Sequence, residues 1–133
     1  MSAPTVRVWT AVKERDGGMC IVCAAREGLS FQHREAVGMG GSKVRPTVVD
    51  GVTACVPHNE AFEARLQRLA LLRGWKVRGW VNEPARVPVW YPLLGGWHIL
   101  TPDGGREWVS ARAARALMVD VYGDEYERWE MAA

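Results

Sequence analysis

Cys20-Ile21-Val22-Cys23 and Cys55-Val56-Pro57-His58 are the two stretches that decide the fold of this chain. Each stretch separates two metal-ligating side chains by two residues, and a tight turn with this spacing lets both side chains reach one ion. The alternative is three buried cysteines that behave as small apolar residues beside an ordinary surface histidine. Two matched pairs that use every cysteine of the chain favour one structural Zn²⁺ with a complete tetrahedral set of protein ligands. The expected ligands are Cys20, Cys23, Cys55 and His58.

The composition bounds the class of protein. The chain has 133 residues, of which 48% are hydrophobic and 24% charged, so we expect one compact domain or a small core with an appendage. A net charge of +2 permits an acidic partner such as DNA, but a solvated surface of mixed charge would look the same. Every apolar run is shorter than the ~20 residues of a membrane span, and the first residues lack the apolar core of a secretory signal. We therefore expect a cytoplasmic protein with no membrane partner.

The first half of the chain has the expected order strand, loop, strand and helix. Apolar and polar residues alternate over 29–34, which is typical of a strand, and His33 lies near its end. Phe62, Leu66 and Leu69 recur at helical spacing before Gly74, a residue that readily takes the left-handed conformation after a helix. The expected elements are a helix over 10–15, a strand over 29–34, a loop over 38–42, an extended segment over 47–55 and a helix over 58–73.

After Gly74 the composition shifts toward Trp, Val, Pro and Gly. Short strands are expected over 75–81, 87–91, 96–100 and 107–109. Ser110 can cap a last helix that carries Ala113, Leu117 and Val121 inward and ends at Gly123, before an acidic tail. The tryptophans of this half suit a small core better than stacking on unpaired bases. The predicted class is α+β, with a zinc-stabilised core over 1–74 and a packed extension of strands and a helix over 75–133.

Several polar residues lie inside or directly beside the pair of metal-binding turns. Gln32-His33-Arg34, a glycine-rich loop and Asp50 lie between the turns, and Asn59 follows the fourth ligand directly. This arrangement resembles the zinc-stapled form of the HNH nuclease family, in which two such turns bracket a hairpin and a helix. His33 matches the catalytic histidine that ends the first strand. Asn59 matches the last family residue, at the start of the helix.

A wider similarity links the chain to HNH proteins encoded by phages of actinobacteria. The segment His33-Arg34-x-x-x-Gly38-Met39-Gly40-Gly41 is similar to their "HR…GMGG" segment. The matches cover most of residues 15–105, and the metal-binding turns are more specific than the downstream matches. The downstream matches are Gly74-Trp75-x-Val77, Pro84-Ala85-x-Val87-Pro88-Val89, Gly96-Trp97 and Asp103-Gly104.

The resemblance implies a ββα-metal core and metal-dependent hydrolysis of phosphodiester bonds in DNA. It implies that His33 is the general base and that Asn59 gives its amide oxygen to a catalytic divalent cation such as Mg²⁺. Gln32 stands where active relatives commonly have Asp or His, and its neutral oxygen is a poorer ligand for a hard cation. Asp50 aligns with the middle family position, where it could hydrogen-bond to the backbone or approach the cation. Without the resemblance, His33 would be an ordinary strand histidine and Asn59 an ordinary first-turn residue of a helix.

The basic residues of the glycine-rich segment, Arg34, Lys43 and Arg45, could contact phosphates. The helix arginines Arg65 and Arg68 could do the same or form a solvated face. The expected partner is DNA, with phage terminase or recombination proteins as further partners and the host cytoplasm as the location. Two alternatives stay open: an HNH-like zinc module that binds DNA or a DNA-processing protein without cutting, and a zinc-stabilised protein-interaction domain.

Overall fold

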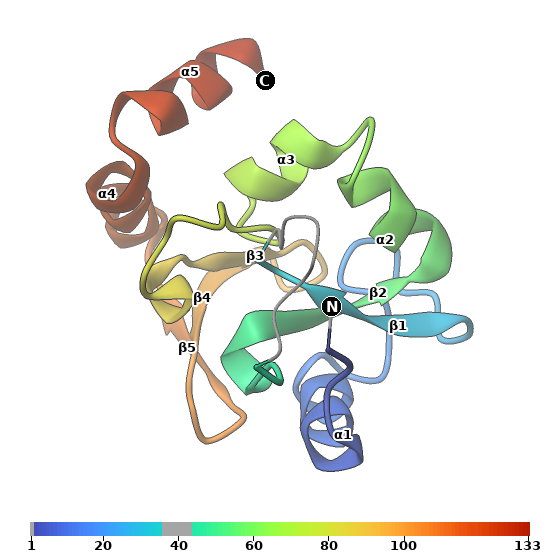
Figure 1. Cartoon of the computed structure of the whole chain (residues 1–133). Helices are drawn as coiled ribbons and strands as arrows, with labels where there is room; N and C mark the ends of the chain where they lie inside the picture. The colour runs from blue at the N-terminus through green and yellow to red at the C-terminus, as the bar shows by residue number, and fades with distance from the viewer. Residues whose placement is uncertain (1, 36–43) are drawn as a thin grey trace.

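The computed structural model describes residues 2–35 and 44–133, and over these residues the protein is a mixed α/β structure (Figure 1). The described residues form five α-helices and two small antiparallel sheets. The helices are α1 Val6–Arg15, α2 Val56–Phe62, α3 Gln67–Leu72, α4 Ala111–Tyr122 and α5 Asp124–Ala132. The strands are β1 Leu29–His33, β2 Gly51–Cys55, β3 Val89–Tyr91, β4 Gly96–Leu100 and β5 Arg106–Val109. Within the described ranges, no helix combines the length and the apolar character that crossing a membrane requires.

The first sheet is the antiparallel hairpin of β1 and β2, whose register pairs Leu29 with Cys55 and His33 with Gly51. The predicted strand over 29–34 is confirmed, because β1 covers all but its last residue. The extended segment predicted over 47–55 is only partly present. Its first part is the short 3-10 helix Val48–Asp50, and the strand begins at Gly51. The loop predicted over 38–42 lies outside the described residues.

The single helix predicted over 58–73 is wrong, because the segment forms two helices. α2 begins two residues earlier, with Pro57 in its first turn, where a missing N–H costs no hydrogen bond. After Phe62 the backbone tightens into i→i+3 hydrogen bonds, such as the one from the Ala64 N–H to the Ala61 carbonyl, and α3 restarts at Gln67. The prediction for Gly74 holds: its φ of 76° is left-handed, and a Cβ there would overlap the Pro88 carbonyl oxygen.

The second half contains the meander β3–β4–β5, close to the expected strands over 87–91, 96–100 and 107–109. The strand predicted over 75–81 does not form. Its only ladder contact in the described structure is one bridge between Val77 and Glu35, beyond the end of β1.

The last part of the chain is helical to a greater extent than expected. Ser110 caps α4 as predicted, with Oγ accepting from the Ala113 N–H at 3.0 Å. The buried positions of α4 are Ala114, Met118 and Tyr122, one residue later than predicted, while Ala113 is exposed. The expected acidic tail is wrong, because these residues form α5, which buries Tyr126 and Trp129.

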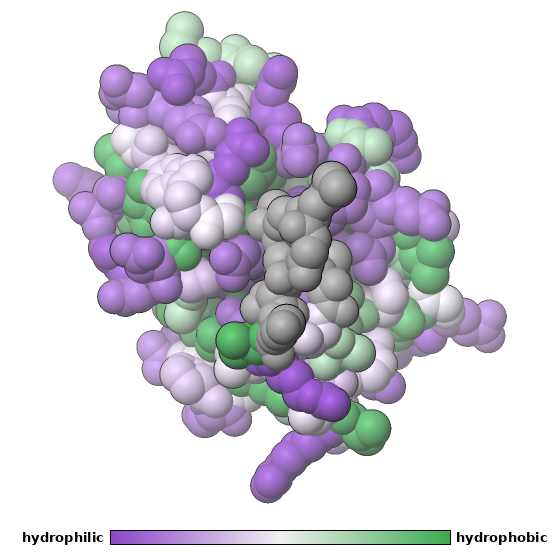
Figure 2. Space-filling view, in the orientation of Figure 1, coloured by the Kyte–Doolittle hydropathy of each residue, from purple (hydrophilic) through white to green (hydrophobic). Residues whose placement is uncertain are grey.

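Two clusters of buried apolar residues fill the interior, and Figure 2 shows that the outer face in that view is mostly hydrophilic. Both clusters combine residues from before and after Gly74. The cluster that we name the zinc-side core consists of Cys20, Ile21, Val52, Ala54, Cys55, Phe62, Ala70, Trp75, Val89, Tyr91 and Leu100. The cluster that we name the helical core consists of Leu71, Leu72, Val77, Val81, Val87, Met118, Tyr122, Tyr126 and Trp129.

Candidate metal centre

The four predicted zinc ligands meet at one point of the structure. Their ligand atoms all lie within 4.8 Å of one another. The Sγ of Cys20 is 3.8 Å from the Nδ1 of His58, and the sulfurs of Cys23 and Cys55 are also 3.8 Å apart. Tetrahedral zinc, with bonds of about 2.3 Å to sulfur and about 2.0 Å to nitrogen, separates its ligand atoms by about 3.5–3.8 Å. The cluster therefore fits one structural metal ion, with His58 coordinating through Nδ1.

Local backbone structure explains why the ligands converge. In the first turn the Ala24 N–H donates to the Cys20 carbonyl at 2.9 Å, and Ala24 itself has a left-handed φ of 65°. The Ile21 N–H donates to the Thr53 carbonyl at 2.9 Å, which ties this turn to β2. Cys55 ends β2 and is the N-cap of α2, so His58 follows within the first turn of the helix. A left-handed alanine carries a backbone cost of about 1–3 kcal/mol, which the surrounding bonds of the turn must offset.

One side of the cluster is sealed from water and the other is open. Cys20 and Cys55 are buried in the zinc-side core, whereas Cys23 is exposed and His58 is half-buried. Desolvation raises the pKa of the Cys55 thiol to about 11 in the metal-free protein. Because a coordinating sulfur must be a thiolate, metal binding at this centre releases that proton.

His33 lies at the end of β1, on the face of the hairpin that carries Phe31. The two rings make an edge contact with centroids 5.0 Å apart. The Nε2 of His33 donates to the Ser2 carbonyl at 2.8 Å, since a carbonyl oxygen can only accept. The neutral ring in this arrangement carries its proton on Nε2 and leaves Nδ1 as the acceptor.

Asn59 and Gln32 belong to the opposite face of the hairpin. The Nδ2 of Asn59 donates to the Ser30 hydroxyl at 2.8 Å, and Ser30 shares its strand face with Gln32 because side chains alternate along β1. Gln32 is 1% exposed and donates through Nε2 to the His33 carbonyl at 2.9 Å, and its buried Oε1 has no partner within residues 2–35 and 44–133. The structure therefore does not bring the His33 ring and the Asn59 amide into contact.

An ion pair between a buried lysine and an exposed glutamate next to α2 was not predicted from the sequence. Lys76 is 2% exposed, and its ammonium donates to the carboxylate of Glu63. Glu63 follows Asn59 by four positions, so both project from the same side of the α2 segment. No spacing in the sequence links Lys76 to this helix, because the contact joins two segments through the fold.

The sequence left two roles open for Asp50, a hydrogen bond to the backbone or an approach to the cation, and the structure shows the hydrogen bond to the backbone. Its Oδ2 accepts from the Thr47 N–H at 2.7 Å and from the Thr47 hydroxyl at 2.9 Å, which closes a capping box at the start of the 3-10 helix. Its carboxylate is thus committed to the connection that enters β2.

Of the three predicted phosphate-binding residues, one is buried, one is exposed and one lies outside the described residues. Arg34 is fully buried, and its guanidinium donates to the carbonyls of Val49, Gly74, Pro84 and Val87 at 2.7–3.2 Å. Burial, followed by the charge of Arg15, lowers its pKa to about 10, so it stays charged at neutral pH. A phosphate cannot reach Arg34, which instead joins the end of β1 to the second half of the chain. Arg45 is exposed, and Lys43 lies outside the described residues.

Comparison with known proteins does not assign the chain to a family. No family model, no curated protein and no solved structure matches the chain. The chemistry that the site can perform is therefore inferred from its own residues alone.

Proposed function

We propose that the chain is a zinc-stapled HNH-type endonuclease that hydrolyses phosphodiester bonds in DNA. The observation that carries this proposal is the position of the cluster, which ties the β1–β2 hairpin to α2 at Cys55 and His58. His33 ends β1 and Asn59 directly follows the fourth ligand along the chain, which is the order in the family that the sequence resembles.

His33 is the proposed general base. Its hydrogen bond to the Ser2 carbonyl fixes the proton on Nε2, so Nδ1 is the nitrogen that can take a proton from water. Orientation of an imidazole by a backbone carbonyl is a common way to select one tautomer. The first residues of the chain thus become positioning residues for the base.

The resemblance assigns two amide oxygens to the cation that this chemistry requires, and both belong to the hairpin face opposite the His33 ring. The Oε1 of Gln32 is a buried acceptor without a partner among the described residues, and the Oδ1 of Asn59 stays available because Nδ2 makes the bond to Ser30. Mg²⁺ or a similar ion would neutralise charge on the phosphate and the leaving oxygen. Both oxygens are neutral, so water and phosphate must supply most of the other ligands.

A second function, a DNA-binding HNH-like module that does not cut, is favoured by a specific observation. Glu63, one helical turn after Asn59 at the C-cap of α2, is paired with the buried ammonium of Lys76. That pairing neutralises its carboxylate, which therefore does not supply the negative charge that favours a divalent cation beside Asn59.

A plasmid-nicking assay tests the proposal. The protein is incubated with supercoiled DNA and added Mg²⁺, Mn²⁺ or Ni²⁺, and the metal-free arm omits these ions, because EDTA would also remove the zinc. We expect metal-dependent nicking that falls about 100-fold or more in His33→Ala, the usual range for a lost general base. His98→Gln is the matched control, since His98 is a buried histidine of the second half that bonds to Arg106.

The outcomes separate the two functions. Nicking that needs both an added metal and His33 supports the endonuclease. No nicking with any metal, together with salt-dependent DNA binding, supports the module instead. Absence of both activities contradicts both proposals.

A further inference from the structure

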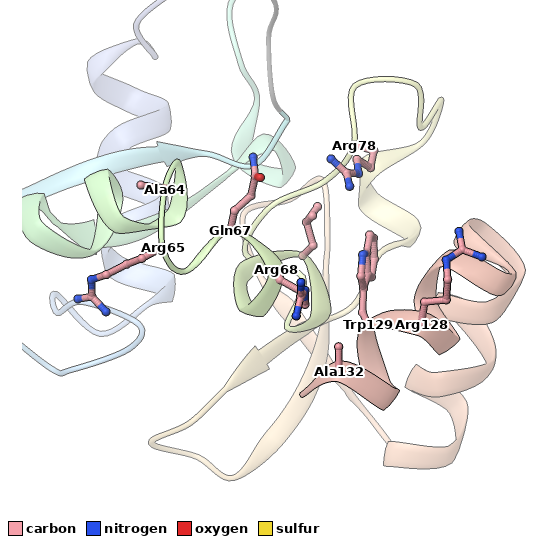
Figure 3. Close-up of a pocket in the computed structure, with 9 residues that line it drawn as sticks. Ala64, Arg65, Gln67, Arg68, Arg78, Arg128, Trp129 and Ala132 are labelled. Carbon is pink, nitrogen blue, oxygen red and sulfur yellow. The ribbon is translucent and has the colours of Figure 1, made fainter.

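The packing of α3 against α5 leaves an open cleft of about 690 Å³ whose rim is rich in arginine (Figure 3). The lining residues include four arginines and no acidic side chain. Arg65 and Arg68 come from the α2–α3 side, Arg78 from the segment after α3, and Arg128 from α5. The whole chain has a net charge of only +2, so this cleft concentrates positive charge in one place.

Three acidic residues of the segments that form the cleft are already paired with basic side chains. Glu63 pairs with Lys76, and Glu130 pairs with Arg115. Glu125 pairs with Arg78, the only rim arginine that makes an ion pair within the described part of the chain.

The three other rim arginines, Arg65, Arg68 and Arg128, have no such partner among the described residues. All three are exposed. Their positive charge is thus available to an external anion.

The floor of the cleft is apolar and firmly packed. It includes Leu71, which is 4% exposed, and Trp129, which is 7% exposed. The Trp129 ring contacts the Tyr122 ring at 4.8 Å between centroids, and the guanidinium of Arg78 lies 5.7 Å from the Trp129 ring. Because Trp129 is buried, it cannot stack on an inserted base, so a ligand must be recognised mainly through charge on the rim.

We propose that this cleft binds the sugar–phosphate backbone of DNA. Guanidinium groups recognise phosphate oxygens with two parallel hydrogen bonds, and arginines from several segments around an open cleft suit a chain of phosphates better than one small anion. The choice of DNA as the polyanion rests on the proposed function. The position of the cleft is independent of that function, because none of the residues that line it is one of the proposed site residues His33, Asn59 and Gln32. DNA binding and cleavage are therefore separable by mutation.

Fluorescence anisotropy with a short fluorescein-labelled duplex DNA, between about 50 and 200 mM NaCl, tests this proposal. The test variant is the triple substitution Arg65→Gln, Arg68→Gln and Arg128→Gln, which leaves the paired Arg78 in place. We expect the slope of log K against log salt to become shallower by about 2 to 3, from about 0.9 per lost phosphate contact. The Kd should rise by about tenfold or more at about 100 mM salt.

The matched control is Arg7→Gln, Arg26→Gln and Arg112→Gln, three exposed arginines outside the cleft that give the same change in net charge. Equal weakening in the two triple variants overturns the proposal, as does unchanged binding by the cleft variant. Wild-type protein that fails to bind the duplex overturns it as well. Poly-glutamate that competes as well as DNA, and loses this ability in the cleft variant, overturns the assignment to nucleic acid. Both variants must keep a melting temperature close to that of the wild type, so that a change in Kd reflects lost charge and not unfolding.

The test is independent of the endonuclease proposal. Loss of DNA binding in the cleft variant, while His33→Ala protein binds like the wild type, supports the cleft whether or not the wild type nicks plasmid. Conversely, a cleft variant that binds normally and still nicks plasmid overturns the cleft and leaves the endonuclease standing.

Discussion

The zinc-side core and the helical core belong to one small protein but are stabilised by different chemistry. The zinc-side core contains two of the four residues of a cluster that could hold one metal ion. The helical core contains no ligand and is closed by large rings, among them Tyr122 against Trp129. Arg34 links the regions through carbonyls on both sides. A short chain can thus combine a core built beside a candidate metal cluster with an ordinary apolar core.

Loss of the metal should give the largest difference between the two cores. Cys55→Ser removes a buried ligand, and zinc binding contributes on the order of 10 kcal/mol in small zinc domains. We expect loss of bound zinc and loss of amide hydrogen-exchange protection in β1 and β2, with more protection retained in α4. The measurements are zinc content and hydrogen exchange. A variant that keeps the wild-type exchange pattern without zinc would show that the metal does not support the fold.

Arg34→Met should give the next largest effect, because it separates the two cores without touching a metal ligand. The carbonyl oxygens of Val49, Gly74 and Val87 would lose this donor, while the Pro84 oxygen would keep the Val87 N–H; each lost bond costs about 1–3 kcal/mol when the acceptor is left unpaired. We expect a loss of roughly 5 kcal/mol in the free energy of unfolding, measured by urea denaturation. Arg34→Lys should recover only part of this loss, since one ammonium group cannot donate to as many carbonyls as the planar guanidinium does. Arg45→Met, an exposed change of the same kind, should stay within about 0.5 kcal/mol of the wild type.

Trp129→Ala should affect the helical core alone and give the smallest effect of the three. Removing a buried tryptophan typically costs about 3–5 kcal/mol, and we expect the lower end because one side of the ring borders the open cleft. Zinc content should stay at the wild-type level, which separates this variant from Cys55→Ser. Trp108→Ala is the control, because Trp108 is 68% exposed. Loss of zinc in Trp129→Ala would mean that the cores fold as one unit.

Local patterns in the sequence predicted the elements that local interactions determine. The alternation in β1, the Ser110 cap and the left-handed Gly74 each depend on a few neighbouring residues. The break between α2 and α3 and the helix α5 could not be predicted in this way. The helix α5 packs against α3, a segment far away in the chain. The break between α2 and α3 is a local tightening of the backbone that no glycine or proline of residues 58–73 marks in the sequence.

The same distinction between local and long-range interactions applies to the candidate site. The four ligands were predictable because each pair is only three positions apart in the chain. The burial of Arg34 was not, because its acceptors lie 15 to 53 positions away. The arginine cleft was not predictable either, since Arg128 reaches the α3 helix only through the packing of α5.

Gly74 has a consequence for anyone who wishes to dissect the protein. The composition changes at this glycine, so it is the natural place to divide the chain into two expressed fragments. Yet its backbone touches Pro88 so closely that no side chain fits, and its carbonyl accepts from Arg34 at 3.0 Å. A fragment that stops at residue 74 would also lose Trp75, Val89 and Leu100 from the zinc-side core. The change of composition at Gly74 therefore does not separate two independent units. The two halves pack tightly at this residue in the folded protein, and they have to be produced as one chain.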